Sequence, residues 1–195
     1  MTTTTQAPWI QTIDGHAFNL LAPDPSHISI RTIATVLSRL CRFGGHSRQF
    51  YSVADHSTRV CDLVMNALPG QHAVHLAALL HDAHEAFSGF GDVCRPAKML
   101  APVIDQVHAG INEAIAARFK FAVDLFGHEQ IHHADNVMLA TELRDLMRTP
   151  PVPWDWLPPP NPLRVYPQTM HDAAYRFECY ACDLCSKLRS SGETT

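Results

Sequence analysis

One stretch of the sequence gathers polar residues suited to chemistry among apolar neighbours. Residues 77–87 have the sequence AALLHDAHEAF, in which Asp82 follows His81 directly and Glu85 comes one helical turn later. On a continuous helix His81 and Glu85 are about 40° apart, so the three polar side chains share one sector. Burying them among Ala, Leu and Phe is costly unless they are paired. A metal ion pairs with them best, and a solvent-facing helix end is the alternative.

Two further residues complete a possible ligand set. His56 precedes this stretch on a predicted helix of its own, and Asp135 follows it on a later one. Two imidazoles and two carboxylates from three helices suit a divalent transition metal, with coordination positions left for water and a substrate. The thirteen histidines of the chain are a high number, which adds weight to a metal. These residues are too far apart in the sequence for their spacing to show that they meet. Whether they form one site depends on how the helices that carry them pack.

The expected secondary structure is helical apart from one short hairpin. Asp14-Gly15 between apolar segments predicts a hairpin over residues 9–20 with a type I′ turn. Capping residues, helical apolar periodicity and Pro or Gly stops predict the other elements. These are helices from 29 to about 43, over 52–68 and 72–87, from 102 onwards, over 129–148 and over 169–188, with a loop over 88–98. We therefore expect an all-α fold with a small N-terminal β-hairpin.

The length and composition of the chain fit one domain. Its 195 residues are 46% hydrophobic and 17% charged, which is typical of a globular protein with a substantial core. We expect a disordered tail over residues 1–8 and a single domain over 9–195. Residues 149–162 contain seven prolines, so they can be neither helix nor central strand. We expect them to form an extended wrap that buries Trp154 and Trp156.

The net charge and the cysteines indicate which kinds of ligand and which cellular compartment to expect. A net charge of −4 argues against nucleic-acid binding through a broad basic face, although the arginines over residues 31–59 suit a phosphate-bearing ligand or a solvated surface. No signal peptide or membrane span is evident, and the cysteines do not resemble a disulfide framework, so we expect a cytoplasmic protein. Cys179, Cys182 and Cys185 have a spacing like that of iron–sulfur motifs. On one helix they point in different directions, so reduced packing is preferred and metal binding is the alternative.

The order His56, His81-Asp82, Asp135 on successive helices resembles the HD-domain phosphohydrolase superfamily. The pattern His81-Asp-x-x-Glu85, then Gly91-Asp92 and Pro96-x-Lys98, is similar to the branch that holds the 5′-deoxynucleotidases. Arg42-Phe43 ahead of the segment Tyr51-Ser-Val-Ala-Asp-His56-Ser57 is similar to the phage-encoded members, which include dATP triphosphohydrolases. The resemblance covers about residues 9–148. Two extra residues between Glu85 and Pro96, and Cys94 where proline is common, depart from it.

The resemblance implies an HD-domain helical bundle, a set of site residues and a metal. The implied metal ligands are His56, His81, Asp82 and Asp135. They would hold Co²⁺, Mn²⁺ or Zn²⁺, with additional Mg²⁺ on the substrate phosphates. Glu85 would be the acid/base group. The implied substrate-binding residues are Arg42 and Lys98 on phosphate, Phe43 on the base and Asp92 on the deoxyribose. The resemblance also implies a homo-oligomer, a dimer or a hexamer, in the host cytoplasm if the gene is phage-borne.

The function that follows is hydrolysis of a deoxynucleotide, with dATP as the best single substrate and deoxyadenosine and phosphate as products. The alternatives are a 5′-deoxynucleotidase acting on monophosphates, a non-catalytic nucleotide-sensing module and an oxygenase with two irons. The oxygenase needs further ligands, for which Glu142 and spare histidines are the candidates. We expect Glu142 instead to pair with Arg59 or Arg144, and His84 to be structural. His132 and His133 either reach the leaving group or begin a solvated helix.

Overall fold

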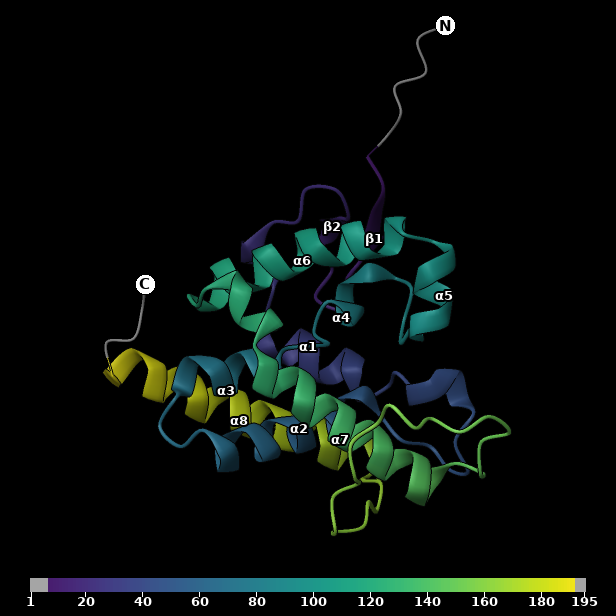
Figure 1. The fold of residues 1–195 in the computed structure, drawn as a ribbon. Helices are drawn as coiled ribbons and strands as arrows, with labels where there is room; N and C mark the ends of the chain where they lie inside the picture. Colours follow the sequence, from purple (N-terminus) through teal and green to yellow (C-terminus); the bar gives the residue numbers. More distant parts are fainter. Residues whose placement is uncertain (1–6, 192–195) are drawn as a thin grey trace, which may run out of the picture.

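The computed structural model describes residues 7–191, so most of the predicted N-terminal tail lies outside it. The described chain is mostly helical with one small antiparallel hairpin, which confirms the expected all-α class (Figure 1). The α-helices are α1 Ile30–Leu37, α2 Val53–Ala67, α3 His72–Leu79, α4 Glu85–Ser88, α5 Arg95–Leu100, α6 Val103–Phe119, α7 Glu129–Leu146 and α8 Met170–Ser191. The strands are β1 Trp9–Gln11 and β2 Ala17–Asn19, and short 3₁₀ helices are η1 Pro25–His27, η2 Arg42–Gly45 and η3 Val123–Gly127.

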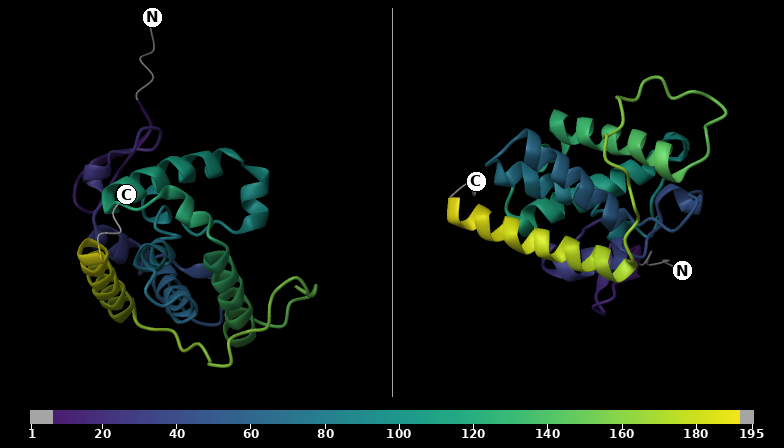
Figure 2. Two further views of the ribbon diagram at one scale, coloured as in Figure 1. Left: turned by 60° about the vertical axis from the view of Figure 1, so that its left-hand side comes forward. Right: turned by 90° about the horizontal axis from the view of Figure 1, so that it is seen from below.

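Helix α2 is the centre of the bundle. It contacts α3, α7 and α8, and Figure 2 shows it between α8 on one side and α7 on the other. Nearly every residue in its first half is buried, because neighbouring helices cover it on several sides. Helix α8 places a stripe of apolar side chains on this core, spaced three or four residues apart as helical geometry requires. These are Ala173, Phe177, Ala181, Leu184 and Leu188.

The hairpin forms with a different turn from the one predicted. Ile10 pairs with Phe18, and Thr12 N donates to His16 O at 2.9 Å, which leaves a three-residue loop in place of a two-residue type I′ turn. Gly15 has φ +85 at the end of this loop, the left-handed conformation that a bulged three-residue turn needs. Phe18 is fully buried and stacks on Phe87 at 4.8 Å, so the hairpin covers α4.

The predicted helix over 72–87 is wrong, because the chain leaves α-helical geometry at Leu80 and resumes it at Glu85. The side chain of His81 provides the physical reason. Its Nδ1 lies 2.8 Å from the carbonyl oxygen of Ala78, the acceptor that a continuing helix would use for the N–H of Asp82. The His81-Asp82 pair therefore lies in a turn between α3 and α4, and the 40° argument no longer applies to it.

Three other segments differ from expectation. The helix expected from 29 to about 43 ends at Leu37, and Arg42–Gly45 form the separate 3₁₀ helix η2. Helix α5 lies inside and beyond the predicted loop 88–98, with Pro96 in its first turn, where a missing N–H costs nothing. Residues 149–162 form no helix or strand, as expected, but Trp156 is 57% exposed and not buried. The far end of this segment is fixed to α7, since Asn161 N donates to Thr141 Oγ1 at 2.8 Å. None of the helices described over residues 7–191 has the length and apolarity to cross a membrane.

Candidate metal centre

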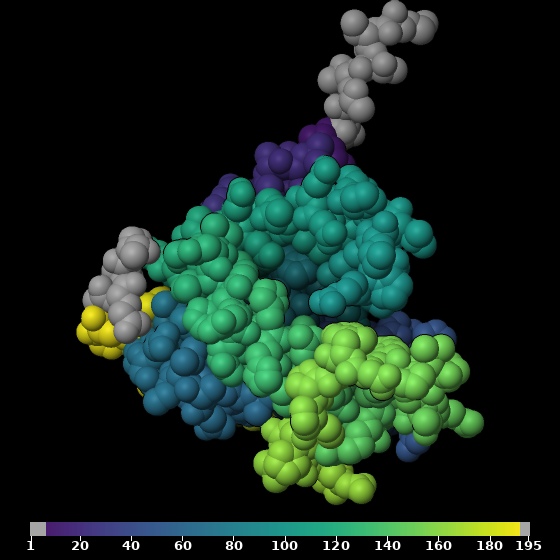
Figure 3. All heavy atoms as spheres, viewed as in Figure 1, coloured from purple at the N-terminus to yellow at the C-terminus, as the bar shows by residue number. Residues whose placement is uncertain are grey.

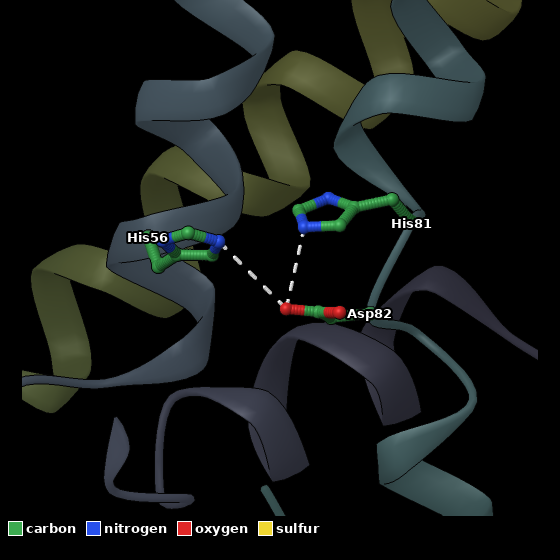
Figure 4. A group of neighbouring side chains, drawn as sticks. All are labelled: His56, His81 and Asp82. Atoms are coloured by element: carbon green, nitrogen blue, oxygen red, sulfur yellow. Dashed lines mark ion pairs between the residues drawn. The ribbon is translucent and has the colours of Figure 1, made fainter. Parts of the chain in front are cut away.

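The structure brings His56, His81 and Asp82 together at the meeting point of α2 and the turn after α3 (Figure 4). One ligand atom from each of the three lies within 4.8 Å of the others. Asp82 Oδ2 lies 3.3 Å from His81 Nε2 and 3.8 Å from His56 Nε2. His56 is fully buried on the first turns of α2, so the cluster lies against the core.

Asp135 on α7 joins this cluster from the side. Its Oδ1 lies 3.1 Å from His56 Nε2, because α7 packs along α2. The side chain of Asp135 is 34% exposed, whereas that of His56 is fully buried. Asp135 therefore faces solvent on one side and the cluster on the other.

The two imidazoles have the arrangement of metal ligands. His81 Nδ1 is bonded to the Ala78 carbonyl and His56 Nδ1 lies 2.6 Å from Glu142 Oε1, so both Nδ1 atoms are donors to oxygen. In a neutral ring that tautomer leaves the lone pair on Nε2, where a metal ion can take the place of a proton. Both Nε2 atoms are buried and make no hydrogen bond, and both face Asp82. Histidine ligands of metals are commonly oriented by such a bond through the other ring nitrogen. The cluster therefore fits a divalent metal ion.

We expected Glu142 to pair with Arg59 or Arg144, and this expectation is wrong. Those arginines bind Asp55 and Asp145, each with an N–O distance of 2.8 Å or less. Glu142 is fully buried and lies on the same face of α7 as Asp135, two turns further on, where that face meets α2. Besides facing the His56 ring, its carboxylate accepts hydrogen bonds from Tyr51 Oη at 2.9 Å and from Arg42 at 3.3 Å.

The electrostatics of the cluster favour positive charge at its centre. Burial and Arg42 lower the pKa of His56, but Glu142 and Asp135 outweigh them and raise this pKa to about 9. Burial raises the pKa of Asp135, but its contact with His56 lowers it to about 2. The carboxylates are thus ionised and hold a proton on the imidazole between them. A divalent cation can replace that proton, which is the usual exchange when a histidine site loads metal.

A cavity of about 480 Å³ opens directly over the cluster, and Figure 3 shows the surface hollowed between the teal and green segments. Of the nine site residues expected from the sequence, all but the two histidines line it. These are Arg42, Phe43, Asp82, Glu85, Asp92, Lys98 and Asp135. His132 and His133 do not line it and are exposed at the start of α7. The cavity also has lining residues that the sequence did not suggest for the site, among them Arg95, Asn136, Trp154 and Trp156.

Arg42 and Glu85 are both buried in the cavity wall. Arg42 is charged and surrounded by carboxylates, whereas the environment of Glu85 favours its neutral form. The Arg42 guanidinium lies 3.3 to 3.8 Å from the carboxylates of Asp82, Asp92 and Glu142, so its charge is shared among three anions. Burial, followed by the nearby Asp82 and Asp92 carboxylates, raises the pKa of Glu85 well above its usual value. Glu85 therefore holds a proton in this environment and can donate it.

His84 has a partner that the sequence did not suggest. Its ring lies 4.1 Å from that of His108 on α6, and both side chains are buried. Burial, together with the positive charge that His108 would carry, lowers the pKa of His84 to about 3, and burial lowers that of His108 to about 4. Both rings are therefore neutral at pH 7. Asp82, His84 and Glu85 form a second group close enough to share a metal ion.

The three C-terminal cysteines stay apart from this chemistry. Cys179 and Cys182 are exposed on α8 and Cys185 is half-buried, and each is a free thiol. Over residues 7–191, no group with metal-binding geometry includes them. Of the packing expected for these three cysteines, the structure shows it only for Cys185.

Sequence comparisons relate the chain to two bacterial proteins. It is 37% identical over 138 residues to the uncharacterized protein YfdR of Escherichia coli K12, a match that covers 71% of this chain and 72% of YfdR. It is 40% identical over 93 residues to an uncharacterized protein of Rhodobacter capsulatus, a match that covers 46% of each chain. No family model matches the sequence.

Proposed function

The chain belongs to the same family as YfdR of Escherichia coli, and we propose that it is an HD-domain phosphohydrolase that uses a divalent metal to hydrolyse deoxynucleotides. The observation that carries this proposal is the convergence of His56, His81 and Asp82 beneath an open cavity. A purely structural histidine cluster would satisfy its buried nitrogens internally. Here the buried Nε2 atoms face carboxylates from two other elements, Asp82 for both rings and Asp135 at 3.1 Å for His56.

We propose Co²⁺, Mn²⁺ or Zn²⁺ as the metal. Two imidazole nitrogens with one or two carboxylates suit transition metals better than Mg²⁺, which prefers oxygen ligands. Bound there, such an ion supplies Lewis acidity and a water of lowered pKa. The protein fixes the ligands in advance, since Ala78 orients His81 and Glu142 orients His56. Additional Mg²⁺ would enter with the substrate phosphates.

Glu85 is the proposed proton carrier. It lines the cavity beside Asp82, and the cost of ionising it there favours its protonated form. A carboxylic acid in that state can protonate the oxygen of a leaving group at neutral pH. Once a cation offsets the buried negative charges around it, Glu85 can also ionise, and in that form it can accept a proton.

Lys98 and Arg95 on α5 are the cations best placed to hold phosphate. Both line the cavity, and among residues 7–191 neither has a carboxylate within 4.0 Å. Arg42 is also proposed to contact phosphate, but three carboxylates already share its charge. Its stronger role is to hold Asp82 and Glu142 in place. Asp92 accepts a 2.7 Å hydrogen bond from Phe43 N and lines the cavity, which is compatible with its proposed contact to deoxyribose.

We propose dATP as the preferred substrate, with deoxyadenosine and phosphate as products. The test is to incubate metal-free protein with each of the four dNTPs and dNMPs in the presence of Co²⁺, Mn²⁺ or Zn²⁺. The products are then separated by chromatography. The proposal predicts that dATP is consumed fastest. Activity on monophosphates alone would establish a 5′-deoxynucleotidase, and binding without product from any of the eight would indicate a nucleotide-sensing module.

A further inference from the structure

The cavity over the metal centre has an aromatic wall that comes from the Pro-rich segment. Trp154 and Trp156 both line the cavity that Asp82 and Asp135 also line. Their rings are nearly parallel, with centroids 6.3 Å apart and planes 18° apart. The pair is far from the rest of the site in sequence, and it offers the largest aromatic surface in the cavity lining.

A large part of this aromatic surface stays in contact with solvent. Trp156 is 57% exposed and Trp154 is only partly buried, although tryptophan has one of the largest apolar surfaces to remove from water. The guanidinium of Arg95 lies over one face of the Trp156 ring, 5.7 Å from its centroid, in a cation–π contact that helps to hold the ring. Exposed aromatic surface beside a polar site typically serves a ligand.

The segment that carries the two rings is stiff. Prolines stand on both sides of the pair, at positions 153 and 158–160, and they restrict the backbone. Leu157 N donates to Trp154 O at 3.0 Å, which closes a turn around the pair. Beyond it, Arg144 of α7 donates to Asn161 O at 2.8 Å and to Leu163 O at 3.1 Å. The rings are thus held in position before a ligand arrives, which lowers the entropic cost of binding.

We propose that Trp154 and Trp156 form the stacking surface for the base of the nucleotide. The inference rests on the proposed function for the identity of the ligand. Carboxylates, cations and two indoles line the same cavity, and these are the groups that a molecule with both a phosphate and a planar heterocycle requires. Phe43 lines the same cavity and can contact the second face of the base. A two-ring purine gains more contact area from indole stacking than a pyrimidine does, which favours a purine nucleotide.

Tryptophan fluorescence tests this directly, because the chain has only three tryptophans and the third, Trp9, lies on β1 away from the cavity. The Trp9→Phe variant restricts the signal to Trp154 and Trp156. Metal is removed with a chelator to prevent turnover, and the protein is excited at a wavelength that adenine does not absorb. dAMP should quench the emission saturably, whereas 2-deoxyribose 5-phosphate, which lacks only the base, should not. Equal quenching by the two ligands, or none by either, would overturn the inference.

Kinetics supply a second readout on the metal-loaded enzyme. Trp156→Ala and Trp154→Ala should each raise KM for dATP by about 5- to 150-fold with little change in kcat, since stacking is worth about 1–3 kcal/mol per base. Trp156→Phe should recover part of the loss, and Trp9→Ala is the matched control with unchanged constants. If both alanine variants keep the wild-type KM while hydrolysis continues, the stacking surface is refuted and the proposed function stands. If base-dependent quenching persists but no nucleotide is hydrolysed, the surface stands and the proposed function fails.

Discussion

The Oε1 atom of Glu142 lies 2.6 Å from Nδ1 of His56, on the side of the ring away from the metal centre. Burial raises the pKa of this carboxyl, but the charges of His56 and Arg42 outweigh burial and lower it, so the group is ionised. An ionised carboxylate on Nδ1 fixes the tautomer of His56 and makes its Nε2 a better donor to a metal. Glu142 is therefore placed to orient His56, although it does not line the cavity.

Replacing Glu142 should weaken metal binding. Glu142→Gln keeps the size of the side chain but loses the charge behind His56, and such changes typically cost about 10–100-fold in metal affinity. The measurement is the metal dissociation constant by competition with a chromophoric chelator. Glu129→Gln, an exposed glutamate on the first turn of the same helix, is the control. An unchanged dissociation constant for Glu142→Gln would show that the contact with His56 does not tune the site.

Changing Glu85 should separate chemistry from binding. Glu85→Gln removes the proton that this buried carboxyl carries, so kcat should fall by about 10²–10⁴-fold while the metal stays bound. Steady-state kinetics with dATP, alongside elemental analysis, give both quantities. Loss of the metal would make Glu85 a ligand, together with Asp82 and His84. Turnover near the wild-type rate would place the proton carrier elsewhere.

Changing Lys98 should have the complementary effect. Lys98→Ala removes a cavity-lining cation without touching the metal ligands, so KM for dATP should rise while kcat changes less. The same comparison with 2′-deoxyadenosine, which has no phosphate, provides the control, since its binding should not depend on Lys98. Equal losses for the two ligands in calorimetric titrations would remove Lys98 from the phosphate site.

The His84–His108 pair should make the protein sensitive to acid. Both rings have a lowered pKa in the fold, about 3 and about 4, whereas an unfolded histidine titrates near 6.5. Below pH 6.5 the unfolded chain takes up protons that the folded chain excludes. This contribution to stability is therefore complete above about pH 7 and is lost as the pH falls toward 4.

Urea unfolding of metal-free protein at pH 7 and pH 5 measures this effect. The His84–His108 pair should contribute a loss on the order of 1–2 kcal/mol per histidine between the two conditions, and the comparison of variants separates it from His56, whose raised pKa has the opposite effect. His108→Asn should lose less over the same interval, while His171→Asn, a change at an exposed position on α8, should behave as wild type. If His108→Asn loses as much stability as wild type, burial of neutral His108 does not contribute.

The assembly state is a further prediction. Several large apolar side chains are exposed on one copy of the chain, including Leu100 at 88%, Met99 at 78% and Leu163 at 76%. Covering such residues between copies is a common reason for association, and most soluble oligomers are symmetric. We expect a homo-oligomer, a dimer or a hexamer. Light scattering that gives the mass of a single chain at micromolar concentration would contradict this.

The parts that local patterns control could be predicted from the sequence. Capping residues and apolar periodicity located the main helices, and Ser29 and Ser52 do cap α1 and α2. The break after Leu79 could not be predicted from periodicity, because the surrounding Ala and Leu residues favour a helix. It depends on the ring of His81 competing for one backbone carbonyl. The expected all-α class survives this local error, since the bundle depends on the long helices.

The candidate metal centre also has one part that could be predicted from the sequence and one part that could not. His81 and Asp82 form a short motif that can be recognised in the sequence, and His56 and Asp135 follow from the order of such motifs. The contact of Glu142 with His56 joins residues 86 positions apart and exists only because α2 packs on α7. Its one sequence signal was its place two turns beyond Asp135 on the same helix. The exposed pair Trp154 and Trp156 also required the structure, since apolar residues are ordinarily expected to be buried.

Metal content measured together with phosphate release tests the central claim most directly. Wild type, His81→Ala and His132→Ala are loaded with Mn²⁺ or Co²⁺, freed of excess ion, analysed for bound metal and assayed with dATP. His132 is an exposed histidine outside the cavity, which makes it the matched control. The account predicts bound metal and phosphate release in wild type and in His132→Ala, and neither in His81→Ala. A folded His81→Ala protein that retains stoichiometric metal and hydrolyses dATP at the wild-type rate would contradict it.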